Sequence, residues 1–177
     1  MRVIAGEFRS RRLKSIAGLS TRPTPDRLRE TLFDILGPRI VGATFLDAYA
    51  GTGAVGIEAL SRGAAHAYFL ERNRGALEAI RENLASLGLE LRATVVAGAV
   101  RANLMRHRAD IVFLDPPYDL EREYAASLEA LGEAAPNLTV AQHSVRLQLG
   151  GDFGKLHRNR LVRQGDNALS FYVDQSA

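Results

Sequence analysis

The sequence predicts an α/β fold: a mostly parallel sheet that ends in an antiparallel hairpin. Short apolar runs alternate with helical patterns from residue 44 to residue 141, and a glycine-rich string follows the first of these runs. After Gly150 the helical pattern disappears, and two strand-like segments flank the turn Gly165-Asp166-Asn167. Short buried strands that alternate with helices are typical of a parallel sheet covered on both faces, and closely spaced strands around a turn indicate a hairpin.

The elements before the sheet form a short basic extension and one helix. Residues 3–8 and 11–16 predict a small hairpin around Arg9-Ser10. Thr24-Pro25-Asp26 then suits an N-cap with proline at the first helical position, and the helix is expected to run to about Leu36, where Gly37-Pro38 stops it.

The remaining elements follow from apolar runs and helix boundary signals. The glycine loop leads into a helix that Gly63 closes, and a later helix runs from Asn73 as its cap to Leu87, ended by Gly88. We expect strands at residues 44–48, 67–70, 91–96, 111–114, 139–141, 155–164 and 168–173. We expect helices at residues 55–62, 73–87, 100–107 and 121–135.

Composition excludes several classes of protein. The 177 residues fit one domain with or without a short appendage, and they include no cysteine, so disulfides and thiolate-held metals are excluded. The four histidines lack metal-ligand spacing, and neither a Gly-x-Ser-x-Gly elbow nor a Walker loop occurs, so we expect no metal. The first residues are charged, and no apolar run approaches the ~20 residues that span a bilayer, so we expect a cytoplasmic protein.

Positive charge is concentrated at the amino terminus. The first 22 residues hold six basic side chains against Glu7 alone, whereas the whole chain carries a net charge of only +3. Such a block is typical of a nucleic-acid contact, because each neutralised phosphate releases counterions, although a solvated basic tail explains the charge equally well. The candidate nucleic-acid-binding residues, with one on the first helix, are Arg9, Arg11, Arg12, Lys14, Arg22 and Arg27.

A glycine string lies where the first buried strand turns into a helix. It runs from Asp47 to Gly56, and glycines at such a turn let the backbone approach a ligand closely. The alternative is that a strand-to-helix turn needs these glycines for steric reasons alone. Asp47 argues against a pyrophosphate ligand and suits one with an ammonium group, such as the methionine part of S-adenosylmethionine. The candidate cofactor residues of this loop are Asp47, Tyr49, Gly51, Thr52 and Gly53.

An acid also follows the second buried strand. Glu71 comes 18 residues after Gly53, and an acidic side chain about 20 residues beyond a glycine loop commonly accepts hydrogen bonds from a ribose diol. A solvent-facing loop acid is the alternative for Glu71 alone. Together with Asp47 and the glycines, it predicts a cofactor site that also includes Arg72.

The fourth buried strand is followed by Asp115-Pro116-Pro117-Tyr118. Ligands of open parallel sheets bind beyond the carboxyl ends of the strands, so we expect this loop and the Gly51 loop to face one crevice. Prolines hold a loop rigid, which makes the Asp115 carboxylate and the Pro116 carbonyl convergent acceptors for an amino group, and Tyr118 offers a face for an extruded base. These four residues are the candidate catalytic set, although two prolines alone also suit a plain turn.

With these motifs in view, the chain resembles the RsmD family of 16S ribosomal RNA guanine-N2 methyltransferases over nearly its whole length. The most specific similarity lies in residues 1–6, 21–30 and 56–63. The resemblance implies a Rossmann-like, S-adenosylmethionine-dependent methyltransferase fold with a seven-stranded, mostly parallel sheet whose last pair is antiparallel. It divides the chain into a basic extension, residues 1–22, that contacts RNA, and a methyltransferase domain, residues 23–177.

The resemblance also implies the activity and its partners. The expected reaction is methyl transfer from S-adenosylmethionine to the exocyclic N2 amine of a guanine in 16S ribosomal RNA, within the small ribosomal subunit or an assembly intermediate. The cofactor would be held by Asp47, Gly51, Gly53 and Glu71, and the guanine by residues 115–118. Two departures stand out, because Ala97-Gly98-Ala99 replaces a common acid after the third strand and Gln142 replaces a glutamate after the fifth.

The sequence also leaves other activities open. The same acceptor loop suits other planar amines, such as adenine N6 in DNA or the side chain of a protein glutamine. A non-catalytic nucleic-acid-binding module that kept the sheet is a further possibility. A nicotinamide-dependent oxidoreductase is disfavoured by Asp47.

Overall fold

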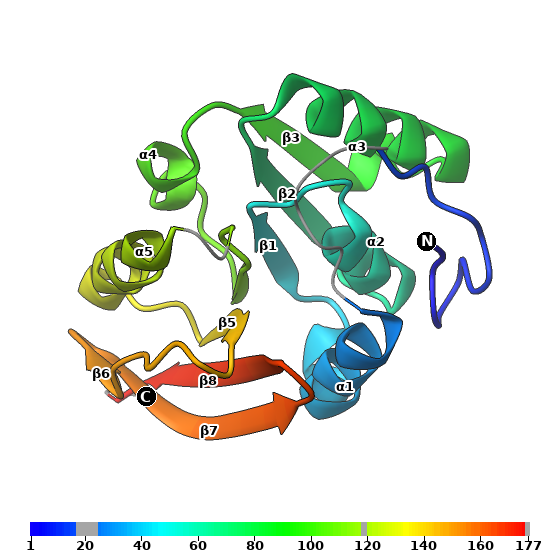
Figure 1. Ribbon diagram of the computed structural model, residues 1–177. Coiled ribbons are helices and arrows are strands. Elements are labelled where there is room, and N and C mark those ends of the chain that lie inside the picture. Colours follow the sequence, from blue (N-terminus) through cyan, green and yellow to red (C-terminus); the bar gives the residue numbers. More distant parts are fainter. Residues whose placement is uncertain (17–24, 118–119, 176–177) are drawn as a thin grey trace.

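The strands form one mixed sheet in the computed structural model, which describes residues 1–16, 25–117 and 120–175. Within these residues the strand order is β3-β2-β1-β4-β5-β8-β7-β6 (Figure 1). The parallel strands are β1 (Thr44–Ala48), β2 (His66–Glu71), β3 (Ala93–Ala97), β4 (Ile111–Leu114) and β5 (Leu138–Ser144). The antiparallel strands are β6 (Asp152–Phe153), β7 (Leu156–Gln164) and β8 (Asn167–Asp174). The predicted α/β architecture with its terminal hairpin is confirmed.

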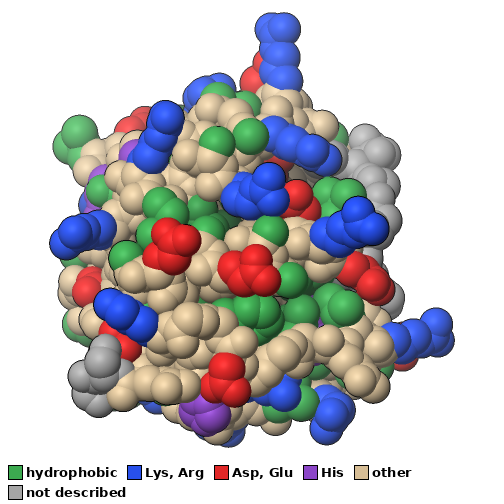
Figure 2. Space-filling view, turned by 90° about the vertical axis from the view of Figure 1, so that its left-hand side faces the viewer, with side chains coloured by type: hydrophobic (Ala, Val, Ile, Leu, Met, Phe, Trp, Pro, Cys, Tyr) green, Lys and Arg blue, Asp and Glu red, His purple; other side chains and the backbone are tan. Residues whose placement is uncertain are grey.

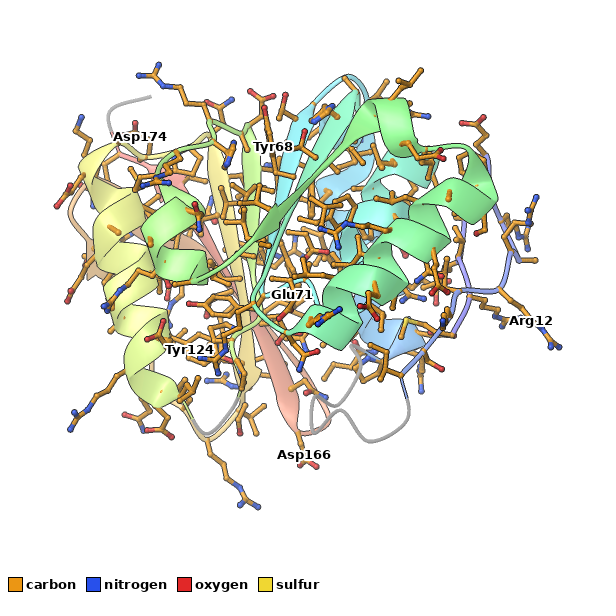
Figure 3. All side chains as sticks on the ribbon, turned by 90° about the horizontal axis from the view of Figure 1, so that it is seen from above. Arg12, Tyr68, Glu71, Tyr124, Asp166 and Asp174 are labelled. Atoms are coloured by element: carbon orange, nitrogen blue, oxygen red, sulfur yellow. The ribbon has the colours of Figure 1, made fainter. Side chains whose placement is uncertain are left out.

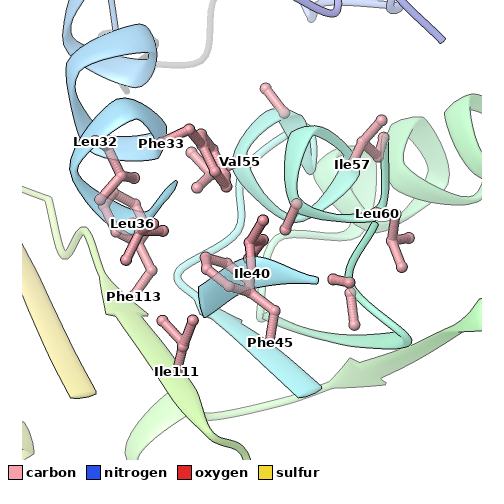
Figure 4. Close-up of a cluster of buried hydrophobic side chains, with 14 of the residues drawn as sticks. Leu32, Phe33, Leu36, Ile40, Phe45, Val55, Ile57, Leu60, Ile111 and Phe113 are labelled. Carbon is pink, nitrogen blue, oxygen red and sulfur yellow. The ribbon is translucent and has the colours of Figure 1, made fainter. Parts of the chain in front are cut away.

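Helices cover both faces of the sheet (Figure 1). The helical elements are α1 (Asp26–Leu36), η1 (Gly37–Ile40), α2 (Ala54–Ser61), α3 (Arg74–Leu87), η2 (Glu90–Arg92), α4 (Val100–Leu104) and α5 (Glu121–Glu133). Side chains of α1, α2 and α3 pack with Phe45 and Phe113 in one core cluster, part of which is shown in Figure 4. Those of α4 and α5 pack with Leu46 and Val112 in the other. Neighbouring residues of one strand therefore face opposite layers, as the two-residue period of a strand requires.

The predicted elements agree with the structure except at several ends. The strands β1 and β4 have the predicted bounds, and Asn73 caps α3 by accepting a hydrogen bond from the backbone N–H of Ala76. The third strand was predicted to begin at Leu91, but that side chain is 97% exposed in η2, because the turn before the strand points it to solvent. β5 is longer than predicted, since its whole length pairs with β8.

The start of α1 and the edge of the sheet also differ from the prediction. Pro25 is the N-cap of α1 rather than its first helical residue, and Thr24 lies outside the described residues. The sheet also gains the two-residue edge strand β6, too short for a sequence pattern to reveal. In the described part of the chain, no helix is long and apolar enough to cross a membrane.

The amino-terminal segment forms a short hairpin that is docked on the domain. Arg2 pairs with Arg12 in an antiparallel bridge, and backbone hydrogen bonds join Val3 to Ser10 and Arg11, so the predicted hairpin is confirmed but is shorter than the predicted strands at residues 3–8 and 11–16. The backbone N–H groups of Ile4 and Ala5, which follow the paired residues, donate to the carboxylate of Glu58 on α2, at 2.8 and 3.0 Å. A longer β-ladder would need backbone groups of this stretch, so docking onto α2 keeps the hairpin short.

A close approach of backbones explains Gly6 in this segment. A Cβ atom built at Gly6 would lie 1.9 Å from the backbone oxygen of Ser61, and the φ angle of Gly6 is +83°. Only glycine combines this conformation with this contact. Val3 and Leu13 are buried beside it, so the segment joins the hydrophobic core.

Candidate active site

A cavity of about 440 Å³ lies at the carboxyl ends of the parallel strands. Tyr49 follows β1, Glu71 ends β2, Ala99 follows β3 and Asp115 follows β4, so the tips of four strands contribute to it. Its lining consists of Tyr49, Gly51, Glu71, Arg72, Asn73, Ala76, Ala99, Val100, Arg101, Ala102, Asp115, Pro117, Leu120 and Glu123. The two loops expected to share one crevice do so.

Glu71 connects the glycine loop to the start of α3. One carboxylate oxygen accepts a hydrogen bond from the backbone N–H of Gly51 at 2.8 Å, and the other accepts from those of Arg72 and Asn73, each at 2.8 Å. The side chain is 9% exposed and lines the cavity; Figure 3 labels it at the tip of β2. Glu71 therefore fixes the shape of the cavity in addition to presenting a carboxylate to it.

Asp47 lies behind the wall of the cavity. It is 1% exposed, and its Oδ2 accepts a hydrogen bond from the backbone N–H of Gly56 at 2.8 Å. Burial, followed by the negative charges of Asp115 and Glu71, raises the pKa of Asp47 well above its usual range, although the Gly56 hydrogen bond opposes this. Asp47 thus holds the turn into α2, and direct contact with an ammonium group stays a prediction.

Tyr49 has an unusual backbone and a fixed hydroxyl. Its φ angle is +64°, a region that non-glycine residues rarely occupy. The hydroxyl donates to Oε2 of Glu123 at 2.9 Å and lies 3.2 Å from Oγ of the buried Ser127, both on α5. Burial, more than any other cause, raises the pKa of Tyr49 to about 12. The tyrosine therefore ties the glycine loop to α5.

Thr52 and Gly53, the other predicted loop residues, lie outside the described cavity lining. The φ angle of Gly53 is +81°, and a Cβ built there would lie 3.2 Å from Ile80 and 3.3 Å from the Phe69 ring. The carbonyl of Thr52 accepts a hydrogen bond from Asn83 of α3 at 3.1 Å. These two residues shape the turn.

Helix α5 holds the acceptor loop, the segment that follows β4 and begins at Asp115, through a hydrogen bond. The Asp115 carboxylate and Pro117 line the cavity, whereas Pro116 is buried and its carbonyl accepts a hydrogen bond from the hydroxyl of Tyr124 at 3.0 Å. Tyr124 is fully buried and is labelled in Figure 3. A carbonyl oxygen has two lone pairs, so this bond leaves Pro116 able to accept a second donor. Tyr118 lies outside the described residues.

Of the predicted basic contacts, Arg11 and Lys14 contact α3, and Arg27 lies on α1. Arg9, Arg11, Arg12 and Lys14 are exposed, and Lys14 forms an ion pair with Glu82 of α3. Figure 3 shows Arg12 on the α3 side of the molecule, far from Tyr124. Arg27 is exposed on α1, and Arg22 lies outside the described residues.

Asn83 links this basic segment to the glycine loop. Its side chain exchanges hydrogen bonds with the backbone of Lys14, at 2.7 and 3.2 Å, and also donates to Thr52. Asn83 is 2% exposed, so these bonds are shielded from water. The basic segment and the loop beside the cavity are therefore mechanically joined.

Several residues that line the cavity were not predicted from the sequence. Val100 and Arg101 begin α4, and the rule that ligands lie at strand tips could have identified them after the third strand. No local signal marks Glu123, which reaches the cavity from the first turn of α5. Figure 2 shows the face that carries α4 and α5, where exposed hydrophobic side chains lie among acidic and basic ones. Among the described residues, no group of three or more metal-ligating side chains occurs.

Comparisons with known proteins were made for the whole chain. The family model described as "Conserved hypothetical protein 95" matches residues 1–173. The chain is 36% identical to "Putative rRNA methyltransferase YlbH" of Bacillus subtilis over 97% of this chain and 98% of that protein. It is 43% identical to "Ribosomal RNA small subunit methyltransferase D" of Escherichia coli over 67% of this chain and 60% of that protein. The solved structure "Putative methyltransferase yhhF" from Escherichia coli has a TM-score of 0.86 and 34% identity, covering 100% of this chain and 99% of that one.

Proposed function

Because the chain belongs to the RsmD family, we propose that it transfers a methyl group from S-adenosylmethionine to the N2 amine of a guanine in 16S ribosomal RNA. The names of its relatives support ribosomal RNA as the substrate class. The observation that carries the proposal is the shared cavity, in which Gly51 and Glu71 face the same space as Asp115. A donor and an acceptor could meet there.

The described lining suits an adenosine-bearing, positively charged donor. The lining holds three acidic residues, Glu71, Asp115 and Glu123, against the two arginines Arg72 and Arg101, and this acidic excess favours a cation. An apolar wall of alanines, Val100 and Leu120 suits a purine. The Gly51 position leaves room for a ligand, since no atom of the described residues lies within 4 Å of a Cβ built there. When bound, S-adenosylmethionine supplies an electrophilic methyl group on sulfur.

The residues of this chain would orient the acceptor. Asp115 would accept a hydrogen bond from the guanine amine and so direct its nitrogen toward the donor. Tyr124 would hold the Pro116 carbonyl as a second acceptor for the same amine. Holding both reactants in contact accounts for most of the rate enhancement that such a site needs, because effective molarities of oriented groups are large.

The basic segment, residues 1–22, would contact RNA, and residues 23–177 would form the methyltransferase domain. Exposed arginines on that segment can neutralise phosphates, and Asn83 fastens the segment beside the loop that borders the cavity. The partner would be 16S ribosomal RNA within the small subunit or an assembly intermediate, and the protein would then act in the cytoplasm.

The test uses tritiated S-adenosylmethionine with small ribosomal subunits from cells lacking the protein, beside free RNA, DNA and bulk protein. We expect label in small-subunit RNA, with N2-methylguanine found by mass mapping. Asp115→Ala should abolish transfer and retain binding of S-adenosylhomocysteine, and Glu121→Gln on the exposed start of α5 serves as the control. Label in DNA adenine or protein glutamine, or cofactor binding without any transfer, would contradict the proposal.

A further inference from the structure

The tip of β3 offers no side-chain acceptor to a purine amine. The residues there are Ala97-Gly98-Ala99, and the lining continues with Val100 and Ala102 at the start of α4. Adenine carries a 6-amino group with two N–H donors. A donor that is buried without an acceptor costs about 1–3 kcal/mol, so a site selective for adenosine needs either a backbone carbonyl of this loop or a side-chain acceptor from another element.

Three acidic residues line the cavity, and they differ in position and in the hydrogen bonds that their carboxylates already accept. Glu71 already accepts three backbone hydrogen bonds at the tip of β2. Asp115 lies on the loop after β4, in the acceptor motif. Glu123 comes from α5, which packs against α4, so it is the carboxylate carried by the helix beside the wall that follows β3.

The Glu123 carboxylate is held in place. Its Oε2 accepts the hydrogen bond from the Tyr49 hydroxyl at 2.9 Å, and Ser127, which is fully buried, lies 3.2 Å from the same hydroxyl. A tyrosine hydroxyl is protonated at neutral pH and can donate, and burial raises the pKa of Tyr49 further, to about 12. A carboxylate offers about four lone-pair sites, so one such bond fixes its orientation and leaves it able to accept from a ligand.

The strained backbone of Tyr49 supports a positional role for this contact. A residue with φ of +64° persists only where its surroundings hold it, and such strain is found preferentially at ligand sites. The hydrogen bonds to α5 are part of what holds it here. Glycine loop, helix and carboxylate thus form one unit facing the cavity.

We propose that Glu123, oriented by the Tyr49 hydroxyl, accepts a hydrogen bond from the adenine 6-amino group of the methyl donor and so replaces a side-chain acceptor at the tip of β3. The assignment rests on the proposed function, because it presumes an adenosine-bearing donor in this cavity. Glu123 is then a specificity-determining residue for the donor, and Tyr49 is its positioning residue.

The test compares two ligands whose purines differ at position 6 and at the neighbouring N1. S-adenosylhomocysteine carries the 6-amine and an N1 acceptor, whereas S-inosylhomocysteine carries a 6-carbonyl oxygen, which a carboxylate repels, and an N1–H donor. Calorimetric dissociation constants for the wild type should favour the adenosyl compound by about 100-fold, since a site built for a hydrogen bond discriminates strongly against its loss. No methyl transfer is needed for this measurement.

Two variants and a matched control separate the roles. Glu123→Gln can donate to the inosine carbonyl, so its preference should fall to about tenfold or less. Tyr49→Phe keeps the carboxylate but loses its orientation, and the preference should fall by a few-fold. Glu121→Gln makes the same chemical change on an exposed side chain of α5 and should behave as the wild type. Thermal denaturation verifies that each variant is folded.

An unchanged ligand preference in Glu123→Gln would overturn the assignment. The same holds if this variant loses only RNA methylation at an unchanged preference, because the carboxylate would then recognise the RNA base. If the wild type itself fails to bind S-adenosylhomocysteine, the proposed function fails and this assignment with it, which is distinguishable from failure at Glu123 alone.

Discussion

Replacing Glu58 by glutamine should release the amino-terminal segment from the domain. The carboxylate is fully buried and accepts hydrogen bonds from the backbone of Ile4 and Ala5 and from Nε of Arg62 at 2.8 Å. Nε of the fully buried Arg29 lies 3.9 Å from it. A glutamine has one acceptor oxygen in place of two and no charge, so at least one backbone donor would face an amide N–H.

The cost follows from the burial of these groups. Removing one partner of a buried ion pair typically costs about 3–5 kcal/mol, because the remaining charge is left without compensation. Burial already lowers the pKa of Arg29, and Glu58 is the largest influence that opposes this. For a chain of this size about 2–4 °C of melting temperature corresponds to 1 kcal/mol, so the midpoint should fall by roughly 6–20 °C.

Urea and thermal denaturation measure the loss, and limited trypsin digestion reports on the segment itself. Cleavage after Arg9, Arg11 or Arg12 should become faster in Glu58→Gln while the rest of the domain persists. Affinity for RNA should fall, whereas binding of S-adenosylhomocysteine should change little, because Glu58 does not line the described cavity.

Glu82→Gln provides the control, since it removes a carboxylate whose ion pair with Lys14 is about half exposed. Exposed pairs contribute about 0–1 kcal/mol, so its midpoint should hardly move. If Glu58→Gln lost less than about 1 kcal/mol, or if its segment stayed as protected as in the wild type, the argument that Glu58 anchors the segment would be wrong.

Three further outcomes are expected. Tyr124→Phe removes the hydroxyl that holds the acceptor loop and should lower kcat without changing affinity for S-adenosylhomocysteine; an equal loss in both would show a general structural defect. The pKa of Tyr49 is raised from 10.0 to about 12, so its contribution to the free energy of unfolding is complete below pH 10 and is lost as the pH rises to about 12. When stability is measured by denaturation at increasing pH, Tyr49→Phe should lack this part of the alkaline loss of stability. Gly42→Ala, with φ of +75° and no described atom near its Cβ, should lose about 1–2 kcal/mol in equilibrium denaturation. Gly6→Ala should lose clearly more than Gly42→Ala, because its Cβ would in addition overlap the backbone of Ser61.

Much of the fold was predictable because it depends on neighbours along the chain. The apolar runs at residues 44–48 and 111–114 became strands with those bounds, and Asn73 and Gly88 mark the ends of α3 as expected. The parallel order of these strands brought the Gly51 and Asp115 loops to one cavity. Strand tips of a parallel sheet share an edge whatever packs around them.

The extent of the amino-terminal hairpin was predicted wrongly because distant partners compete with local ones. Residues 1–3 pair with residues 10–13, but the backbone of Ile4 and Ala5 binds Glu58, more than 50 residues away, so the pairing does not extend over residues 3–8. The Asp47 side chain is buried against the backbone of α2, and its contact with the ligand stays a prediction. Sequence spacing identified the turn but carried no information on which way the carboxylate points.

The sequence by itself determined the alternation of strands and helices, the position of the glycine loop and the loop after the fourth strand, because those depend on periodicities of two to four residues. Only the tertiary structure decided that Glu123 and Tyr49, 74 residues apart, meet at the cavity and that Glu58 receives the amino-terminal backbone. Contacts of that kind arise when packed layers bring distant side chains within hydrogen-bond range, and no local pattern encodes the distance between layers.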